Sequence, residues 1–181
     1  MDGSFELRSL RERPFDLLRE LDRRARTAAQ GKPEAAASGA EWVGIAFRLG
    51  GEAFLLAREE TREVMGYPAT VTRVPGAKGW IRGLSNVRGQ LMPIVDLRAF
   101  LGSGATGATR ATRVLVANHR EIPAGLLVDE VMGFRRFYES EFSADLPPTL
   151  LRCERYLAGA FRRGAEVWPV FSVRALLESP Q

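Results

Sequence analysis

The sequence contains one cysteine, one histidine and only two lysines, Lys32 and Lys78, among its 26 basic residues. The single cysteine, Cys153, excludes an internal disulfide and is typical of a protein from a reducing compartment. One histidine and one cysteine cannot form the ligand clusters that hold transition metals, so we expect no metal site and no cofactor. No apolar run approaches the roughly 20 residues of a membrane span, and no signal peptide is evident. We therefore expect a cytoplasmic protein without direct membrane insertion.

Catalytic motifs are lacking as well. His119 stands in a predicted turn near Glu121, but a general base also needs a partner that orients its ring. Cys153 has Arg152 and Arg155 close to it in sequence, which favour a thiolate but supply no base. The sequence contains no phosphate-binding loop, dinucleotide fingerprint or nucleophile elbow. We therefore predict that the chain is not an enzyme.

The remaining composition is that of a globular protein. Its 181 residues suffice for one ordinary domain or two small ones, and 45% are hydrophobic and 27% charged. The formal net charge of +4 is modest, and the basic residues are spread along the chain. A basic balance favours an acidic partner or nucleic acid only where the charges cluster, so the charge alone selects no partner.

Residues 80–102, WIRGLSNVRGQLMPIVDLRAFLG, contain the clearest local pattern. Apolar runs at 84–87 and 91–95 flank a turn that contains glycine, which predicts a β-hairpin with Arg88 exposed at its tip. Pro93 cannot donate to a β-ladder, so its strand is expected at a sheet edge or at a bulge. This hairpin is the feature around which we interpret the rest of the chain.

Other segments have the apolar runs or alternation of short strands, separated by turn residues. They lie at residues 42–49, 54–56, 70–74, 112–117, 123–128, 131–137, 156–161 and 167–171. Residues 42–49 alternate as a half-buried strand does, whereas residues 58–65 fit either a helical turn or a strand. Asp96 and Ser172 precede short apolar segments and are expected to cap helical turns. Many short strands favour barrels or sandwiches, and no internal sequence repeat is predicted.

The N-terminal part has a different pattern. Residues 14–29 begin with a proline and carry leucines along one side, which predicts an amphipathic helix. Residues 30–40, QGKPEAAASGA, are small and polar, which predicts a linker. The helix either packs on the chain's own domain or docks elsewhere. We therefore divide the chain into a helix and linker at 1–40 and a domain at 41–181.

Aromatic and basic residues are interleaved at 134–138, FRRFY. Small β-barrels can bind single strands by stacking bases on aromatic side chains over a positive groove. Alternation along a strand places Phe134 and Phe137 on opposite faces, which weakens such a platform. A single-stranded nucleic-acid-binding protein is therefore the alternative function, and no nucleic acid is expected as a partner.

Four segments together resemble one protein family. They are REVMGY at 62–67, NVRGQLMPIVDLRAFLG at 86–102, GLLVDEVMGF at 125–134 and YLAGAFRRGAEVWPVFSVRALL at 156–177. In this order they are similar to the CheW-like adaptors of bacterial chemotaxis-type pathways, over nearly all of residues 42–178. The resemblance implies a mainly β fold with two small five-stranded, SH3-like β-barrels and short helices, here with an N-terminal helical extension.

The resemblance also implies a function. CheW-like proteins are non-catalytic scaffold proteins that couple the cytoplasmic tip of methyl-accepting chemoreceptors to the regulatory domain of a chemotaxis-type histidine kinase. They act in signal-transduction arrays in the cytoplasm, associated with receptors in the membrane. The N-terminal extension and the residues of the segments REVMGY and NVRGQLMPIVDL resemble those of the branch that serves type IV pilus twitching motility.

Site residues follow from the family by position. They predict a receptor-binding groove formed by Thr61, Glu63, Val64 and Arg88, with a salt bridge between Glu63 and Arg88 on neighbouring strands. The kinase-binding residues are unknown, because two similar barrels offer two surfaces. Trp168-Pro169 departs from the aliphatic strand usual in the family, so an irregular last strand is expected.

Overall fold

The computed structural model describes residues 39–179. The helix predicted over 14–29 and nearly all of the linker predicted over 30–40 lie outside this range. The described chain is mainly β, as predicted. Its strands are β1 (Glu41–Leu49), β2 (Glu52–Ala57), β3 (Thr61–Gly66), β4 (Ile81–Val87), β5 (Gln90–Asp96), β6 (Arg113–Ala117), β7 (Gly125–Val128), β8 (Glu130–Tyr138), β9 (Phe142–Ser143), β10 (Leu157–Arg163) and β11 (Glu166–Phe171). Its helices are α3 (Leu97–Phe100), α4 (Val173–Leu177) and the 3₁₀ turns η2 (Arg58–Glu60), η3 (Glu139–Glu141) and η4 (Glu154–Tyr156).

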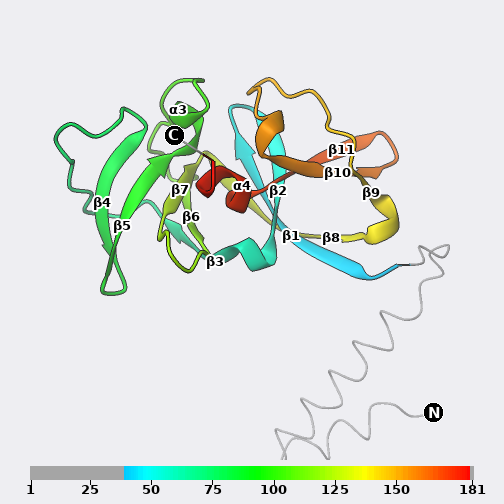
Figure 1. Ribbon diagram of the computed structural model, residues 1–181, viewed down its shortest axis with the longest axis horizontal. Helices are drawn as coiled ribbons and strands as arrows, with labels where there is room; N and C mark the ends of the chain where they lie inside the picture. The colour runs from blue at the N-terminus through cyan, green and yellow to red at the C-terminus, as the bar shows by residue number, and fades with distance from the viewer. Residues whose placement is uncertain (1–38, 180–181) are drawn as a thin grey trace, which may run out of the picture. The chain divides into compact units, whose positions relative to one another are not determined.

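The strands form two sheets. The terminal sheet, with strand order β8-β1-β2-β11-β10-β9, combines the first and last strands of the described chain. The central sheet, with order β3-β6-β7-β5-β4, is formed by the strands between them. The chain passes from the terminal to the central sheet through η2 and returns after β7, and α4 lies between the two sheets (Figure 1). Residues 58–65, which fitted a turn or a strand, are thus divided between η2 and β3.

Both sheets have the same strand arrangement. The order β8-β1-β2-β11-β10 matches β3-β6-β7-β5-β4, with parallel pairing between β2 and β11 and between β7 and β5. The matching hairpins and helices have related sequences, RGLSNVRGQLMPIVDLRAFL at 82–101 and AGAFRRGAEVWPVFSVRALL at 158–177. In each copy a glycine with positive φ follows a bulge, Gly83 at 143° and Gly159 at 147°. The chain therefore contains two copies of one barrel unit, as the resemblance implies, although the sequence patterns alone did not reveal the repeat.

Side chains join the edges of each curled sheet. In the terminal sheet, Arg163 at the end of β10 donates to the Arg136 carbonyl of β8, and the rings of Phe137 and Phe161 stack at 4.7 Å. In the central sheet, an ion pair joins β3 to the β4–β5 hairpin at the opposite edge. The two sheets therefore form the two small barrels that the resemblance implies.

The two copies differ at one edge. The sixth strand of the terminal sheet, β9, is only two residues long and pairs with β10. The same place in the central sheet holds a single bridge between Thr72 and Leu84. The strand predicted over 70–74 is therefore wrong, because this segment pairs with β4 only at Thr72.

Three apolar cores lie on alternate sides of the strands. The shared core, between the two sheets, includes Phe47 and Leu115. Along β6, Val114 turns instead to the core inside the central sheet, and along β1, Ala46 turns to the core inside the terminal sheet. Residues 42–49 are therefore not the half-buried strand that alternation predicts, since the middle of β1 is buried on both faces.

Prolines mark the point where the parallel pairing begins. Pro93 pairs with Leu84, whose backbone groups bond to Thr72 on the other side, so the ring nitrogen of Pro93 points away from β4. Its strand lies inside the sheet rather than at the predicted edge or bulge, but the ladder with β7 begins only at Ile94, so no hydrogen bond is lost. Pro169 holds the same position before the pairing of β11 with β2. The strand β11 is continuous through Trp168-Pro169, and the irregularity at this edge is the bulge of β10 between Leu157 and Gly159.

Candidate functional site

Glu63 and Arg88 form the ion pair that the resemblance predicts. Arg88 occupies the first position of the hairpin turn with a φ of 52°, and Gly89 follows with a φ of 83°, as a tight two-residue turn requires. The Arg88 Nη2 atom lies 2.8 Å from Glu63 Oε2, and 80% of the Arg88 side chain is exposed against 19% of Glu63. A half-buried carboxylate thus orients an exposed guanidinium.

The two partners come from opposite edges of the central sheet, not from neighbouring strands as predicted. The prediction failed because curling of the sheet brings strands together that share no ladder. In a second contact between the same two edges, the arginine belongs to β3 and the acceptor to the hairpin: Arg62 donates to Gln90 Oε1 at 3.1 Å. The sequence patterns gave no sign of this contact, because it depends on the closure of the barrel.

Thr61 and Val64 lie on the other face of β3 from Glu63. A register shift around Arg62 pairs Thr61 with Ala117 and Val64 with Leu115, both residues of the shared core. Val64 is 39% exposed, and the Thr61 hydroxyl is shielded from solvent without a hydrogen-bond partner among residues 39–179. The assignment of all four residues to one receptor-binding groove stays a prediction.

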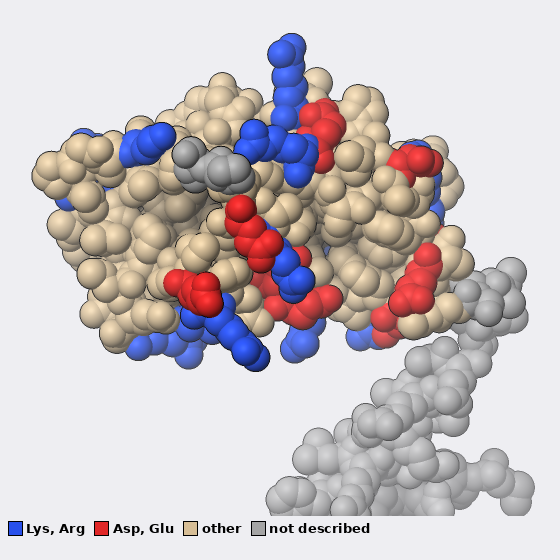
Figure 2. Space-filling model, in the orientation of Figure 1, with Lys and Arg blue, Asp and Glu red and all other residues tan. Residues whose placement is uncertain are grey.

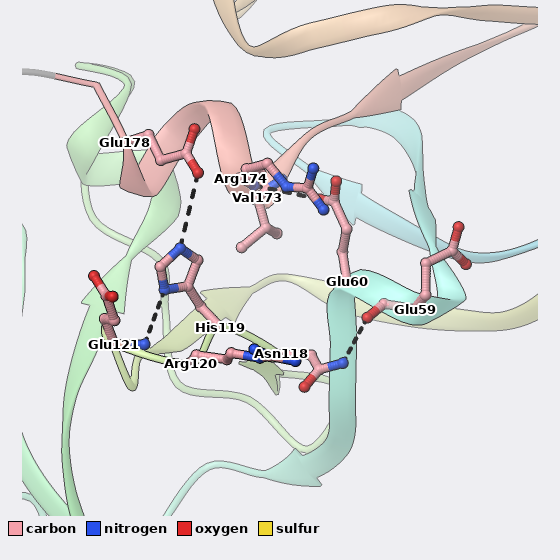
Figure 3. A pocket seen from close by; sticks show the side chains of 9 residues that line it. All are labelled: Glu59, Glu60, Asn118, His119, Arg120, Glu121, Val173, Arg174 and Glu178. Atoms are coloured by element: carbon pink, nitrogen blue, oxygen red, sulfur yellow. Dashed lines mark hydrogen bonds and ion pairs between the residues drawn. The ribbon is translucent and has the colours of Figure 1, made fainter.

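A polar pocket of about 480 Å³ lies where η2, the β6–β7 turn and α4 meet (Figure 3). The Glu60 carboxylate accepts hydrogen bonds from the Val173 and Arg174 amides at 2.6 and 3.4 Å, so it caps α4 from another element. At the other end of α4, His119 Nε2 lies 3.9 Å from Glu178 Oε1. The pocket therefore contains the contacts that hold α4 between the sheets.

His119 is held by its own turn. Its Nδ1 accepts hydrogen bonds from the Glu121 and Ile122 amides at 3.3 and 3.2 Å (Figure 3). The ring thus stabilises the β6–β7 turn through Nδ1 and contacts Glu178 at the end of α4 through Nε2. Sequence analysis missed Glu60, because an isolated glutamate in a charged turn carries no signal for capping a distant helix.

The cysteine and the acidic pair at the junction of β7 and β8 have structural roles. The Cys153 thiol is buried, and burial raises its pKa, so the reactive thiolate is disfavoured. Asp129 Oδ2 accepts from the Gly50 amide at 2.7 Å, whereas the neighbouring Glu130 pairs with Arg48. Within the described residues, no group of three or more histidine, cysteine or acidic side chains could hold a metal ion.

Asp96 is the cap that the sequence predicts, and it does more. Its carboxylate accepts from the Ala99 amide at 3.1 Å and so begins α3. It also accepts from the Thr106 amide at 2.8 Å and pairs with Arg82. Ser172 caps α4 through the Ala175 amide, also as predicted. Asp96 is therefore a buried structural acid.

The FRRFY segment lies in β8, where its phenylalanines are divided between the two faces of the strand. Phe137 is buried in the core of the terminal sheet, whereas Phe134 is 61% exposed. The face drawn in Figure 2 shows basic and acidic side chains interspersed, not one continuous basic surface. Among the described residues, no helix is long and apolar enough to cross a membrane.

Comparisons with known proteins agree on one family. The CheW-like domain family model matches residues 43–181. The chain is 41% identical to Protein PilI from Pseudomonas aeruginosa over 165 residues, which are 91% of this chain and 92% of that protein. It is 30% identical to chemotaxis protein CheW from Bacillus subtilis over 100 residues, 55% of this chain and 64% of that protein. The crystal structure of scaffolding protein TtCheW from Thermoanaerobacter tengcongensis shares the fold, with a TM-score of 0.66 and 22% identity over 82% of this chain and 95% of that chain. The chain belongs to the CheW-like domain family.

Proposed function

We propose that this chain is a non-catalytic adaptor that couples methyl-accepting chemoreceptors to the regulatory domain of a chemotaxis-type histidine kinase. Family membership across residues 43–181 carries this proposal. The polar pocket beside α4 is explained by helix caps and turn contacts, which is consistent with a binding role. The adaptor acts in the cytoplasm, in arrays associated with receptors in the membrane.

The receptor side of the proposal rests on the Glu63–Arg88 pair. An exposed ion pair contributes only about 0–1 kcal/mol to stability, so its position at a barrel edge has another use. Glu63 holds the Arg88 guanidinium in one orientation, where its planar donors can form hydrogen bonds that lysine cannot reproduce. Val64, on the other face of the same edge strand, adds exposed apolar surface, and Thr61 lies beside it on that face.

A pilus-linked pathway is the finer part of the proposal. The likeness to PilI extends over nearly the full length of both chains, including part of the N-terminal extension. We therefore assign the adaptor to the pathway that controls type IV pilus twitching motility.

Calorimetry with the cognate kinase regulatory domain tests the kinase part of the proposal. We expect a one-to-one isotherm, and absence of heat and of co-elution at tens of micromolar would refute it. Arg88→Glu is expected to weaken receptor association while leaving the melting temperature nearly unchanged. Arg110→Glu, which makes the same charge change in an exposed loop, is the control. The double swap Glu63→Arg with Arg88→Glu restores the charge balance but not receptor binding, since the guanidinium then lies on the wrong strand.

A further inference from the structure

A second hollow, which we call the Trp42 hollow, lies between the start of β1 and the β10–β11 hairpin. Its volume is about 470 Å³, and the aromatic rings of Trp42, Phe142 and Phe161 line it together with Ala158. Glu60 and Glu139 stand among its lining residues, and none of the residues that line it is basic. Acidic groups beside aromatic walls, in a protein of formal net charge +4, are complementary to a cation.

The two carboxylates that line the hollow differ in the hydrogen bonds that they accept. Glu60 holds the N-terminus of α4 and accepts from the Ser172 hydroxyl at 3.3 Å. The Glu139 side chain is exposed and forms no ion pair among residues 39–179, although its amide bonds to the Ala40 carbonyl. Phe142 is 41% exposed, so aromatic surface is open to solvent beside a free carboxylate.

The repeat shows which side chain fits at this place. Ala158 corresponds to Arg82 of the central sheet, and each is the unpaired residue at the bulge before the matching glycine. Arg82 reaches back over its sheet, where its Nε donates to Asp96 Oδ2 at 3.0 Å and its Nη2 donates to the Thr106 carbonyl. In the central barrel, an arginine of the chain itself therefore occupies the position where the terminal barrel has alanine.

The terminal barrel also has a carboxylate that can accept from a guanidinium at this place. Asp96 corresponds to Ser172, which has no carboxylate, but Glu60 brings one to Ser172 and to the first amides of α4. Each barrel thus has a carboxylate at the N-terminus of its short helix. In the central barrel this carboxylate has a guanidinium partner from the bulge, and in the terminal barrel the bulge residue ends at Cβ.

We propose that the Trp42 hollow binds an arginine side chain of a partner protein. The guanidinium lies between Glu60 and Glu139, and its aliphatic stem contacts the rings of Trp42 and Phe142. A protein segment suits the site better than a free amine, because Glu60 also lines the polar pocket of Figure 3, which can receive the residues beside the arginine. This binding is separate from the proposed receptor groove, since no residue of that groove lines the hollow.

Isothermal titration of the full chain with two peptides tests the proposal. The first is Ac-Ala-Leu-Arg-Leu-Ala-NH₂, and in the second citrulline, which is neutral and of the same shape, replaces arginine. We expect the arginine peptide to bind at least about tenfold more tightly, because only it forms charge-assisted hydrogen bonds. Glu139→Lys should abolish this preference, whereas Glu166→Lys, a like change outside the hollow, should leave it unchanged.

Ala158→Arg supplies the side chain within the chain and gives an independent test. It should block the arginine peptide and raise the melting temperature by about 3 °C over Ala158→Gln, which adds bulk without charge. Arg88→Glu should leave peptide affinity unchanged, so this proposal and the proposed receptor contact fail independently.

Equal affinity of the two peptides would overturn the proposal and leave only apolar contact. The proposal would also be overturned if the arginine peptide did not bind the full chain. This outcome would mean that residues 1–38 or a second copy occupies the hollow instead. In that case sedimentation velocity shows whether a second copy occupies the hollow, because the dimer then persists when the arginine peptide is added. Unchanged binding to both Glu139→Lys and Ala158→Arg would place the peptide elsewhere and refute the assignment.

Discussion

Asp96→Ser replaces the buried acid of the central barrel with the residue that the terminal barrel has at the same position. Asp96 is 0% exposed and accepts from Arg82, from Ala99 and twice from Thr106, through its amide at 2.8 Å and its hydroxyl at 2.9 Å. A serine at this position can still cap α3, as Ser172 caps α4, because its hydroxyl reaches the third amide of the helix. The variant therefore separates the cap from the other contacts.

The expected cost follows from the groups that lose their acceptor. The Thr106 amide is left buried and unpaired, which costs about 1–3 kcal/mol. Breaking a buried ion pair costs about 3–5 kcal/mol, but the Arg82 side chain is 31% exposed and water recovers part of this. We expect Asp96→Ser to lose about 3–4 kcal/mol of unfolding free energy in total. Asp96→Ala should lose about 1 kcal/mol more, because it also removes the cap.

Urea denaturation monitored by circular dichroism measures these differences, provided that the slope stays constant between variants. Adding Arg82→Ala to Asp96→Ser should recover about 1 kcal/mol, since it removes the guanidinium that has lost its partner. A loss below about 1 kcal/mol for Asp96→Ser would show that Arg82 and Thr106 find other acceptors, and would refute the reasoning.

Three further predictions concern other parts of the chain. Deleting residues 1–38 should leave a cooperative melt, because residues 38–181 form a compact unit of their own, and a loss above about 3 kcal/mol would refute this. Two hydrogen bonds from Arg163 lower the pKa of Glu141 below its ordinary value. The Glu141 carboxylate therefore stabilises the fold above that ordinary pKa and loses this effect as the pH falls through its lower folded pKa. Glu141→Gln should therefore be less stable than the wild type at neutral pH, by less than about 1 kcal/mol, and equally stable in acid; a difference that is constant with pH contradicts this. The buried Cys153 thiol, with its raised pKa, should react with Ellman's reagent only on unfolding, and rapid labelling of the native protein would contradict its burial.

Local features of the fold could be predicted from the sequence where one segment contains all of their determinants. The hairpin around Arg88 and the caps at Asp96 and Ser172 are of this kind, because the turn glycine and the capping side chain act on neighbouring residues. Apart from the strand predicted over 70–74, the limits of the predicted strands were also close to the observed ones. Contacts within a few residues therefore needed no knowledge of the barrel.

Features that depend on barrel closure could not be predicted in this way. Alternation indicated a half-buried strand for residues 42–49, because a single sequence does not show that apolar cores lie on both faces. The expectation that Glu63 and Arg88 lie on neighbouring strands was also wrong, because curling of the sheet joins them from opposite edges. Their pairing was predicted only because the family resemblance supplied it.

The repeat was missed because its two copies have few identical residues, yet it accounts for the division of roles between the barrels. Each barrel joins its edges with an arginine near a hairpin tip and a glutamate, but Arg163 donates to Glu141 twice, whereas Arg88 makes one contact and stays 80% exposed. Each also has a carboxylate at a short helix, which Arg82 neutralises only in the central barrel. In the central barrel, the Arg88 guanidinium is exposed, and the carboxylate at the short helix is paired with Arg82. In the terminal barrel, the Arg163 guanidinium is paired with Glu141, and the carboxylate at the short helix lines an open hollow. A repeated unit that exposes a guanidinium in one barrel and a carboxylate in the other presents two surfaces of opposite charge.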